Sequence, residues 1–241
     1  MATGGLAWGS LAAKSGQSSM ALRPPGALDE KKFSASCIKC GQCLEACPYD
    51  SLLLARPGQD GVNGTPLFVP RETPCYMCPS YPCTVACPSG ALDVENLFDD
   101  NGEASINEAT MGLAVVHKET CVAFWGIQCD ACYRACPLIG EAIKLEFVKN
   151  EVTGKHANMQ PIVNSEVCTG CGICEHVCIV EEAAIRVFPR DIATGKVGDH
   201  YIRSWIEDDE QRINTNQDAF PLKKNLESAL DYLNDTDPID E

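Results

Sequence analysis

Sixteen cysteines are the residues of this 241-residue chain most able to do chemistry, and they fall into four groups of four. In chain order the groups are Cys37, Cys40, Cys43 and Cys47; Cys75, Cys78, Cys83 and Cys87; Cys121, Cys129, Cys132 and Cys136; and Cys168, Cys171, Cys174 and Cys178. The first and fourth groups share the spacing C-x2-C-x2-C-x3-C, the second reads C-x2-C-x4-C-x3-C, and the third reads C-x7-C-x2-C-x3-C. So many regularly spaced thiols exceed what a reduced enzyme needs, and they indicate metal binding.

Iron is the metal that this spacing favours. The first and fourth groups carry the cysteine run of bacterial ferredoxins, in which three thiolates bind one cluster and the fourth binds the neighbouring cluster. Gly41 and Gly172 lie within these groups, where a residue without Cβ lets the backbone approach inorganic sulfide closely. The sequence therefore predicts four [4Fe-4S] clusters, with all sixteen cysteines as metal ligands and no catalytic residue.

Two other uses of the thiols fit the spacing less well. Disulfides would need long-range bridges, and cysteines separated by two residues in every group are a poor framework for them. Zinc prefers isolated C-x-x-C pairs, often together with histidine. His176 lies between Cys174 and Cys178, but we expect it to be a solvent-facing helix residue rather than a metal ligand.

The sequence leaves open two ways of pairing the groups. The linkers between neighbouring groups are short enough for the first to pair with the second and the third with the fourth. The identical spacing of the first and fourth groups favours a nested arrangement instead, in which these two share clusters and the second shares with the third. The nested pairing predicts that Cys178 completes the Cys37 cluster, Cys47 the Cys168 cluster, Cys136 the Cys75 cluster and Cys87 the Cys121 cluster.

The elements that must position these cysteines also repeat. Each group is followed by a small residue and an apolar alternation typical of a short strand, and strand-like pieces precede the later groups. These segments are residues 51–54, 91–94, 142–145 and 184–187, preceded by 68–69, 115–116 and 162–163. With a short helical turn after each third cysteine, the repeat predicts an α+β fold of two bacterial-type ferredoxin modules. Nesting makes residues 37–66 and 157–200 the outer module and residues 67–156 the inner module.

The two ends of the chain lie outside these repeats. Residues 1–22 are typical of the middle and end of a signal peptide, and because no positive charge precedes them, we expect the true start upstream of Met1 and twin-arginine export. A disordered cytoplasmic tail is the alternative. Residues 23–36 indicate an extended linker, and residues 201–241 indicate an extension with an amphipathic helix and an acidic tail. No other segment reaches the roughly 18 uncharged apolar residues that a membrane span needs.

The loop between Cys121 and Cys129 has the sequence VAFWGIQ and is longer than its counterparts. Phe124 and Trp125 could exclude water from a cluster, and solvent exposure is one of the factors that set a cluster's potential. The alternative is that both aromatic side chains only pack the longer loop.

The net charge and the absence of catalytic and nucleotide-binding motifs limit the classes of function that the sequence favours. The formal net charge of −15 argues against nucleic acid and anionic lipid as partners, and it favours an acidic surface that docks proteins with basic faces. Clusters fully ligated by cysteine have no open iron site, so they suit electron transfer better than substrate activation. The run Gly170-Cys171-Gly172 belongs to a cysteine loop rather than to a dinucleotide fingerprint, and four scattered histidines do not support a catalytic triad. We expect an electron-transfer component of a multi-protein redox chain, not an enzyme by itself.

Five segments make the chain similar to the MauM/NapG family of ferredoxin-type proteins. They are RPPGAL (23–28), CGQCLEACPYD (40–50), MGLAVV (111–116), TGKHA (153–157) and VNSEVCTGCGICEHVC (163–178). The resemblance runs from about residue 23 to residue 205 and includes every cysteine, those of the irregular second and third groups among them.

The resemblance implies a periplasmic protein with four [4Fe-4S] clusters, peripheral at the inner membrane. It would work beside a membrane-bound NapH-type iron–sulfur quinol dehydrogenase and pass electrons towards periplasmic nitrate reductase or its cytochrome. Two alternatives remain from other functional classes. One is an electron-transfer subunit of another periplasmic oxidoreductase, such as the methylamine oxidation that MauM-type relatives serve. The other is a maturation factor that uses its clusters to deliver or reduce a partner's cofactor.

Overall fold

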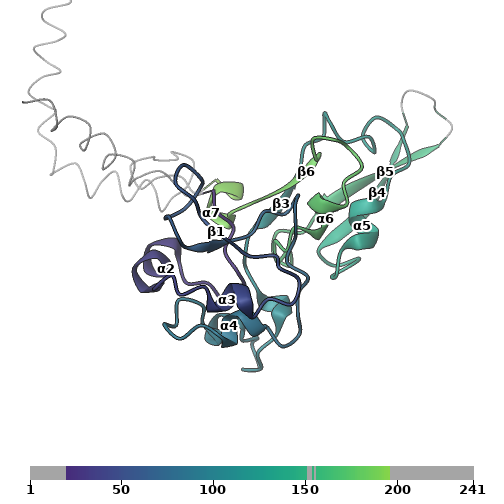
Figure 1. Cartoon of the computed structure of the whole chain (residues 1–241). Coiled ribbons are helices and arrows are strands. Elements are labelled where there is room, and N and C mark those ends of the chain that lie inside the picture. Colours follow the sequence, from purple (N-terminus) through teal and green to yellow (C-terminus); the bar gives the residue numbers. More distant parts are fainter. Residues whose placement is uncertain (1–19, 151–153, 155, 196–241) are drawn as a thin grey trace, which may run out of the picture. The chain divides into compact units, whose positions relative to one another are not determined.

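The computed structural model describes residues 20–150, 154 and 156–195 (Figure 1). Most of the expected signal segment, residues 1–19, and the expected C-terminal extension, residues 201–241, lie outside the described residues. Within the described ranges, no helix combines the length and the apolar character that crossing a membrane requires.

Short helices and two-stranded sheets alternate along the chain. The α-helices are α2 (Glu30–Ser36), α3 (Gln42–Glu45), α4 (Pro82–Val85), α5 (Ala131–Ala135), α6 (Ile173–His176) and α7 (Arg190–Ala193), and two 3-10 helices are η1 (Val94–Leu97) and η2 (Ile106–Glu108). The strands are β1 (Leu53–Leu54), β2 (Pro66–Leu67), β3 (Leu113–Val116), β4 (Ile143–Lys149), β5 (Ala157–Val163) and β6 (Ile185–Phe188). This mixture of short helices and strands agrees with the α+β class.

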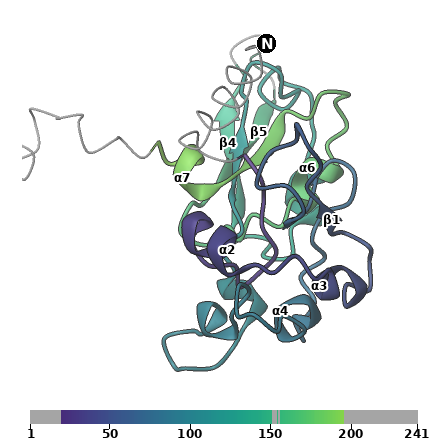
Figure 2. The same cartoon turned by 60° about the vertical axis from the view of Figure 1, so that its left-hand side comes forward.

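Antiparallel pairing joins the strands into three small sheets, β1 with β2, β3 with β6, and β4 with β5. The β3–β6 pair brings together segments far apart in the sequence, with Val115 opposite Arg186. The β4–β5 hairpin is the longest, with seven residues in each strand (Figures 1 and 2). The strands of these sheets precede or follow the cysteine groups along the chain, so they fix the two ends of the cysteine loops.

Most of the strand predictions are confirmed. Residues 115–116, 142–145, 162–163 and 184–187 lie almost entirely in β3, β4, β5 and β6, and residues 53–54 form β1. The strand expected at 68–69 is misplaced, because β2 covers Pro66–Leu67 and Phe68 makes only an isolated bridge to Leu22.

The strand expected at residues 91–94 is wrong. Leu92 makes only an isolated bridge to Ala27, and Val94 already begins η1. The side chain of Asp93 accepts a hydrogen bond from the Glu95 backbone N–H at 3.0 Å. An aspartate that accepts this bond caps the start of a helix, and it therefore ends the extended segment after two residues.

The extended linker expected at residues 23–36 is also wrong, because α2 occupies residues 30–36. Arg23 is 6% exposed, and its Nε and Nη2 donate to the Glu30 carboxylate at 2.9 and 2.6 Å. The Arg23 guanidinium also lies 4.7 Å from the centre of the fully buried Phe33 ring. The proline-rich stretch is thus fixed by a local core of an ion pair and an aromatic ring.

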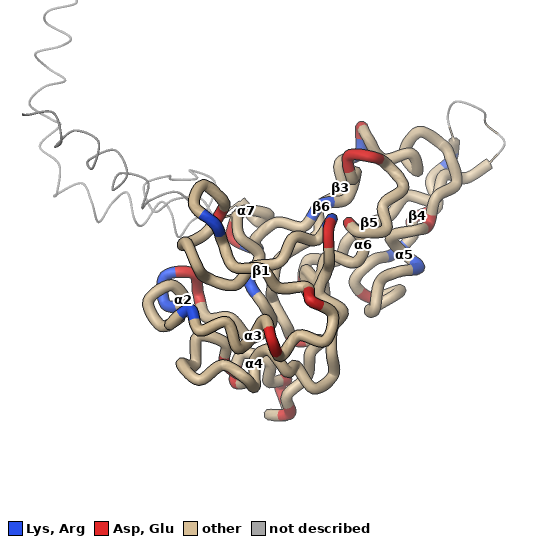
Figure 3. The backbone as a smooth tube through the Cα atoms, in the orientation of Figure 1, with Lys and Arg blue, Asp and Glu red and all other residues tan. Residues whose placement is uncertain are grey.

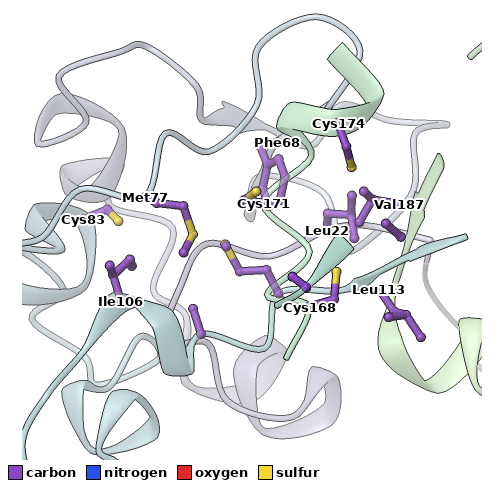
Figure 4. Close-up of a cluster of buried hydrophobic side chains, with 14 of the residues drawn as sticks. Leu22, Phe68, Met77, Cys83, Ile106, Leu113, Cys168, Cys171, Cys174 and Val187 are labelled. Atoms are coloured by element: carbon purple, nitrogen blue, oxygen red, sulfur yellow. The ribbon is translucent and has the colours of Figure 1, made fainter. Parts of the chain in front are cut away.

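One main cluster of buried side chains runs through the described residues, and cysteines are part of it. Figure 4 shows Cys83, Cys168, Cys171 and Cys174 among aliphatic and aromatic neighbours such as Phe68 and Leu113. Because so many thiols are part of the core, metal binding to them is expected to contribute directly to the free energy of folding.

Candidate metal centres

In each of the four groups the third cysteine is the second residue of a short helix. Cys43, Cys83, Cys132 and Cys174 occupy this position in α3, α4, α5 and α6. The fourth cysteine of each group follows the last helical residue by one or two positions, so it leaves the loop that holds the first three. The helical turns predicted after each third cysteine are confirmed, although each begins one residue before that cysteine.

Glycine begins the helix in the two regular groups. Gly41 and Gly172 precede α3 and α6 with φ of 77° and 86°, a left-handed conformation that suits a residue without Cβ. In the irregular groups Tyr81 has φ of 35° before α4, and Asp130 precedes α5 with φ of −128°. The regular and irregular loops therefore reach the same helix position by different backbone paths.

Three spaces in the protein are each lined by four cysteines. Cys47 lies with Cys75, Cys78 and Cys83; Cys136 lies with Cys168, Cys171 and Cys174; and Cys178 lies with Cys121, Cys129 and Cys132. In every case three cysteines come from one group and the fourth comes from the neighbouring group. The spaces have similar volumes of ≈ 400, 350 and 370 Å³, counted with the open solvent at their mouths, as expected if each suits the same kind of occupant.

The remaining cysteines gather around Cys43. Burial, together with the neighbouring Cys83, Cys37 and Cys87, raises the pKa of the Cys43 thiol to about 11. Burial also acts on Cys87, but hydrogen bonds from Leu92 N–H, at 3.4 Å, and from Ser89 bring the net shift of its pKa downwards. Cys40 is exposed, and its membership of this set follows from its spacing to Cys37 and Cys43.

The nested pairing is therefore wrong in this structure. Cys178 lies with the Cys121 set rather than the Cys37 set, and Cys47 lies with the Cys75 set. The physical reason is helix packing, because α3 lies against α4 (Figures 1 and 2) and α5 lies against α6 (Figure 1). Identical spacing of the first and fourth groups reports the local loop shape and says nothing about which helices pack together.

Burial controls the protonation of most of these thiols. It raises the pKa of Cys75 and Cys132 to about 12, with smaller contributions from neighbouring cysteines. The pKa values of Cys83 and Cys171 rise to about 11 for the same first reason, and that of Cys174 rises well above its ordinary value. Several buried thiolates can share one site only if a cationic group neutralises them, and iron in a cluster does this.

The donor set fits an iron–sulfur cluster better than the other uses of cysteine. All sixteen cysteines lie within the described ranges, and all are free thiols. In those ranges no group of three or more His, Cys, Asp or Glu side chains converges closely enough to hold a single metal ion. Four sulfurs that line one space suit a multi-atom group with soft thiolate ligands.

Two aromatic residues expected near the third group behave differently from one another. Phe124 is half-buried against the small cluster of Cys121, Ala123 and Ala184, with the Lys118 ammonium 5.8 Å from its ring centre. Trp125 is 60% exposed, and its Nε1 donates to the Glu119 carbonyl at 2.8 Å. Neither aromatic side chain is among those that line the space of the Cys121 set, so the structure favours the alternative in which they belong to the packing of the longer loop.

Other residues near the sulfurs were not singled out from the sequence. Tyr49 and Tyr76 both line the space of the Cys75 set, and their ring centres are 4.5 Å apart. Their sequence signal is adjacency, because each lies within two residues of a cysteine. His176 is exposed, as expected, and its Nδ1 lies 3.1 Å from the Arg71 carbonyl oxygen. Arg71 itself has no sequence signal, since its contacts are about a hundred residues away.

Charged residues are distributed along the described chain rather than gathered in one segment (Figure 3). Among the described residues, Asp and Glu positions occur around the helices of both halves, so no single described element carries them all.

Comparison with known proteins adds two findings. Residues 36–91 and 125–181 each match the 4Fe-4S dicluster domain family. The first match contains the whole of the first two groups, and the second contains the fourth group and all of the third except Cys121. The matches thus follow neighbouring groups, in agreement with the sulfur positions.

The chain is also similar over most of its length to curated ferredoxin-type proteins. It is 51% identical over 191 residues to "Ferredoxin-type protein NapG" of Escherichia coli (strain K12), covering 79% of this chain and 80% of that protein. It is 52% identical over 188 residues to the protein of the same name from Haemophilus influenzae, covering 77% and 65% respectively. With "Methylamine utilization ferredoxin-type protein MauM" of Paracoccus denitrificans the identity is 49% over 179 residues, covering 74% and 75%.

Proposed function

Because the chain belongs to the MauM/NapG family of ferredoxin-type iron–sulfur proteins, we propose that it relays electrons from a membrane quinol-oxidising partner towards periplasmic nitrate reductase. The observation that carries this proposal is the set of four-cysteine sites, each completed by a cysteine of the neighbouring group. Sites filled entirely by cysteine thiolates leave no iron position open for a substrate. The chain is then a carrier that depends on other proteins for its electrons and for their use.

The proposed ligand sets follow the sulfur positions. They are Cys37, Cys40, Cys43 and Cys87; Cys75, Cys78, Cys83 and Cys47; Cys121, Cys129, Cys132 and Cys178; and Cys168, Cys171, Cys174 and Cys136. The module boundaries change accordingly. Residues 36–91 form what we call the first module, and residues 121–188 form the second module, in place of the outer and inner modules that nesting predicted.

Each bound [4Fe-4S] cluster would accept and release one electron. The chain's own residues would hold the iron, and every cysteine except the exposed Cys40 is buried or half-buried, which limits the access of water to the site. Backbone N–H groups such as that of Leu92, which donates to Cys87 at 3.4 Å, stabilise negative charge on sulfur.

The partners and location form part of the proposal. Resemblance to the family supports a periplasmic protein, exported by the twin-arginine route and held peripherally at the inner membrane. A NapH-type membrane protein is the proposed donor, and nitrate reductase or its cytochrome is the proposed acceptor. The relatives named for methylamine utilization, at 49% identity, support methylamine oxidation as a second candidate pathway.

Iron content tests the first part of the proposal. Anaerobically purified full-length protein is expected to hold about sixteen irons with as much sulfide, and an EPR redox titration is expected to resolve several one-electron signals. A clearly lower iron content in protein reconstituted with excess iron and sulfide would contradict four clusters.

Gene deletion in the source organism tests the second part. Loss of a carrier is expected to abolish quinol-dependent nitrate reduction while the reductase keeps its cofactor and still works with an artificial reductant. Unchanged nitrate reduction with loss of methylamine oxidation would favour the second pathway. A reductase that lacks its cofactor would indicate a maturation factor instead.

A further inference from the structure

Arg71 of the first module reaches the metal-binding segment of the second module. Its Nη1 donates to the backbone carbonyls of Glu175, His176 and Cys178 at 2.8, 3.2 and 2.9 Å, and its Nη2 donates to those of Val180 and Glu181 at 2.9 and 3.2 Å. All these acceptors lie more than a hundred residues further along the chain. One half-buried side chain therefore holds the whole turn from Glu175 to Glu181.

The chemistry of a helix end explains why an arginine is suited to this position. The last carbonyls of a helix have no partner within it, and α6 is only four residues long. A guanidinium is planar, always charged and carries five N–H donors, so one side chain can satisfy several carbonyls that converge on it. The contact is reciprocal, because His176 Nδ1 lies 3.1 Å from the Arg71 carbonyl oxygen, which accepts a hydrogen bond from the Nδ1–H tautomer.

The held turn carries ligands of two different sets. Cys174 lies in α6 and belongs to the Cys168 set, whereas Cys178 follows α6 and belongs to the Cys121 set. The Cys178 carbonyl is itself one of the acceptors of Arg71. The position of this turn therefore decides where both sets receive a sulfur.

Residues on either side of Arg71 extend the same contact. Pro70 packs on Gly172, where an added Cβ would come within 2.6 Å of the Pro70 Cβ. Cys75 N–H donates to the Cys171 carbonyl at 2.9 Å. Met77 lies beside the fourth cysteine group in the buried cluster of Figure 4, where its sulfur accepts a 3.5 Å hydrogen bond from the Thr169 hydroxyl. The segment from Pro70 to Met77 thus lines the fourth cysteine group.

We propose that Arg71 is a positioning residue for the second module: it fixes Cys178 relative to Cys174 and locks the second and fourth cysteine groups against each other. The inference rests on the proposed function in assigning clusters to these cysteines, although the contact between the modules does not depend on that assignment. The Cys75 and Cys171 sites are then neighbours across the junction, and the modules do not act as independent ferredoxins.

Four variants of the full chain test this proposal under anaerobic conditions. Arg71→Gln removes both the positive charge and the planar set of guanidinium N–H donors. Arg71→Lys keeps a positive charge but offers a single nitrogen, which cannot reach five carbonyls. Arg56→Gln is the matched control, because Arg56 is an exposed arginine of the first module. Cys178→Ser identifies which EPR signal belongs to the Cys121 set.

Hydrogen exchange measures the junction directly. In Arg71→Gln the amide of Cys75 is expected to exchange about tenfold faster or more, because charge-assisted bonds that hold the partner loop are lost. Exchange at Ala55, whose N–H donates to Thr65 within the first module, is expected to stay unchanged. Arg71→Lys is expected to fall between Arg71→Gln and the parent protein. Equal exchange at Cys75 in Arg71→Gln and Arg56→Gln would overturn the proposal.

Redox titration supplies a readout that simple destabilisation does not give. In Arg71→Gln, removal of a positive charge near Cys178 is expected to lower the reduction potential of the Cys121 set. Arg71→Lys keeps the positive charge, so its potential is expected to stay close to that of the parent protein. If Arg71→Gln loses iron, the loss must be confined to the Cys121 and Cys168 sets, and equal loss from all four sets overturns the proposal. If the parent protein holds no clusters, the proposed function is contradicted. The hydrogen-exchange rates of Cys75 in Arg71→Gln and Arg56→Gln would still decide whether Arg71 holds the two modules together.

Discussion

The first and fourth cysteine groups have the same spacing, yet the protein surrounds them differently. Cys168, Cys171 and Cys174 are all buried, whereas in the first group Cys43 is buried, Cys37 is half-buried and Cys40 is exposed. The residue after the first cysteine shows the same contrast, because Ile38 is 64% exposed and the equivalent Thr169 is 5% exposed. Equal spacing thus gives equal local loops but not equal environments.

The difference arises from what packs on each loop. The fourth group is covered by the segment from Pro70 to Met77 and by Gly112, against whose backbone Gly170 lies. At the first group, a Cβ added to Gly41 would meet no other protein atom within 4 Å. We infer that the first group is suited to exchange electrons with a partner at the surface, and the fourth to an internal position.

Loss of a cross-group ligand is expected to have the largest effect. Cys178→Ser should remove the EPR signal of the Cys121 set and about four of the irons, while the Cys37 set keeps its signal. The matched variant Cys87→Ser should do the reverse, removing the signal of the Cys37 set. Iron determination and EPR of anaerobic protein measure both. If Cys178→Ser instead abolishes the Cys37 signal, the nested pairing is restored.

The second largest expected effect is a difference between the first and fourth groups in the rate at which their clusters are lost on oxidation. Because solvent access to a site follows its surrounding shell, brief exposure to air or ferricyanide is expected to remove the signal of the Cys37 set several times faster than that of the Cys168 set. A time course of EPR spectra measures the two rates in one sample. Equal rates would mean that the covering segment does not protect the fourth group.

Alanine substitution of the two equivalent glycines, Gly41 and Gly172, compares how closely each loop is packed through the stability that each variant loses. Gly41→Ala is expected to cost about 1–2 kcal/mol, the strain of a left-handed backbone with a Cβ. Gly172→Ala adds a contact of 2.6 Å with the Pro70 Cβ, so about 2–5 kcal/mol is expected from strain and overpacking together. Thermal unfolding of both variants measures the difference. Equal losses would show that Pro70 can move away without cost.

Parts of this architecture were predictable from the sequence because they depend on neighbours in the chain. The third cysteine in a helical turn and the strands at 115–116, 142–145 and 184–187 follow from local spacing and alternation. The strand expected at 91–94 failed because the side chain of Asp93 caps a helix there.

Pairing of the groups was not predictable from spacing, since it depends on which helices pack together. The same holds for Arg71, whose acceptors are 104 to 110 residues away. It also holds for residues 23–36, where Arg23, Glu30 and Phe33 form a local core within a proline-rich stretch. Long-range contacts of this kind leave no periodicity in the sequence.

The smallest expected difference concerns the residue after the first cysteine of each group. Thr169→Val keeps the volume but removes the hydroxyl that donates to the Met77 sulfur at 3.5 Å, so about 0.5–1.5 kcal/mol of stability should be lost. Ile38→Thr at the exposed position should change stability by about 0.5 kcal/mol or less. Thermal unfolding of the two variants measures this pair. A loss at Ile38 as large as that at Thr169 would mean that the first group is also covered, and the contrast between a surface site and an internal site would then fail.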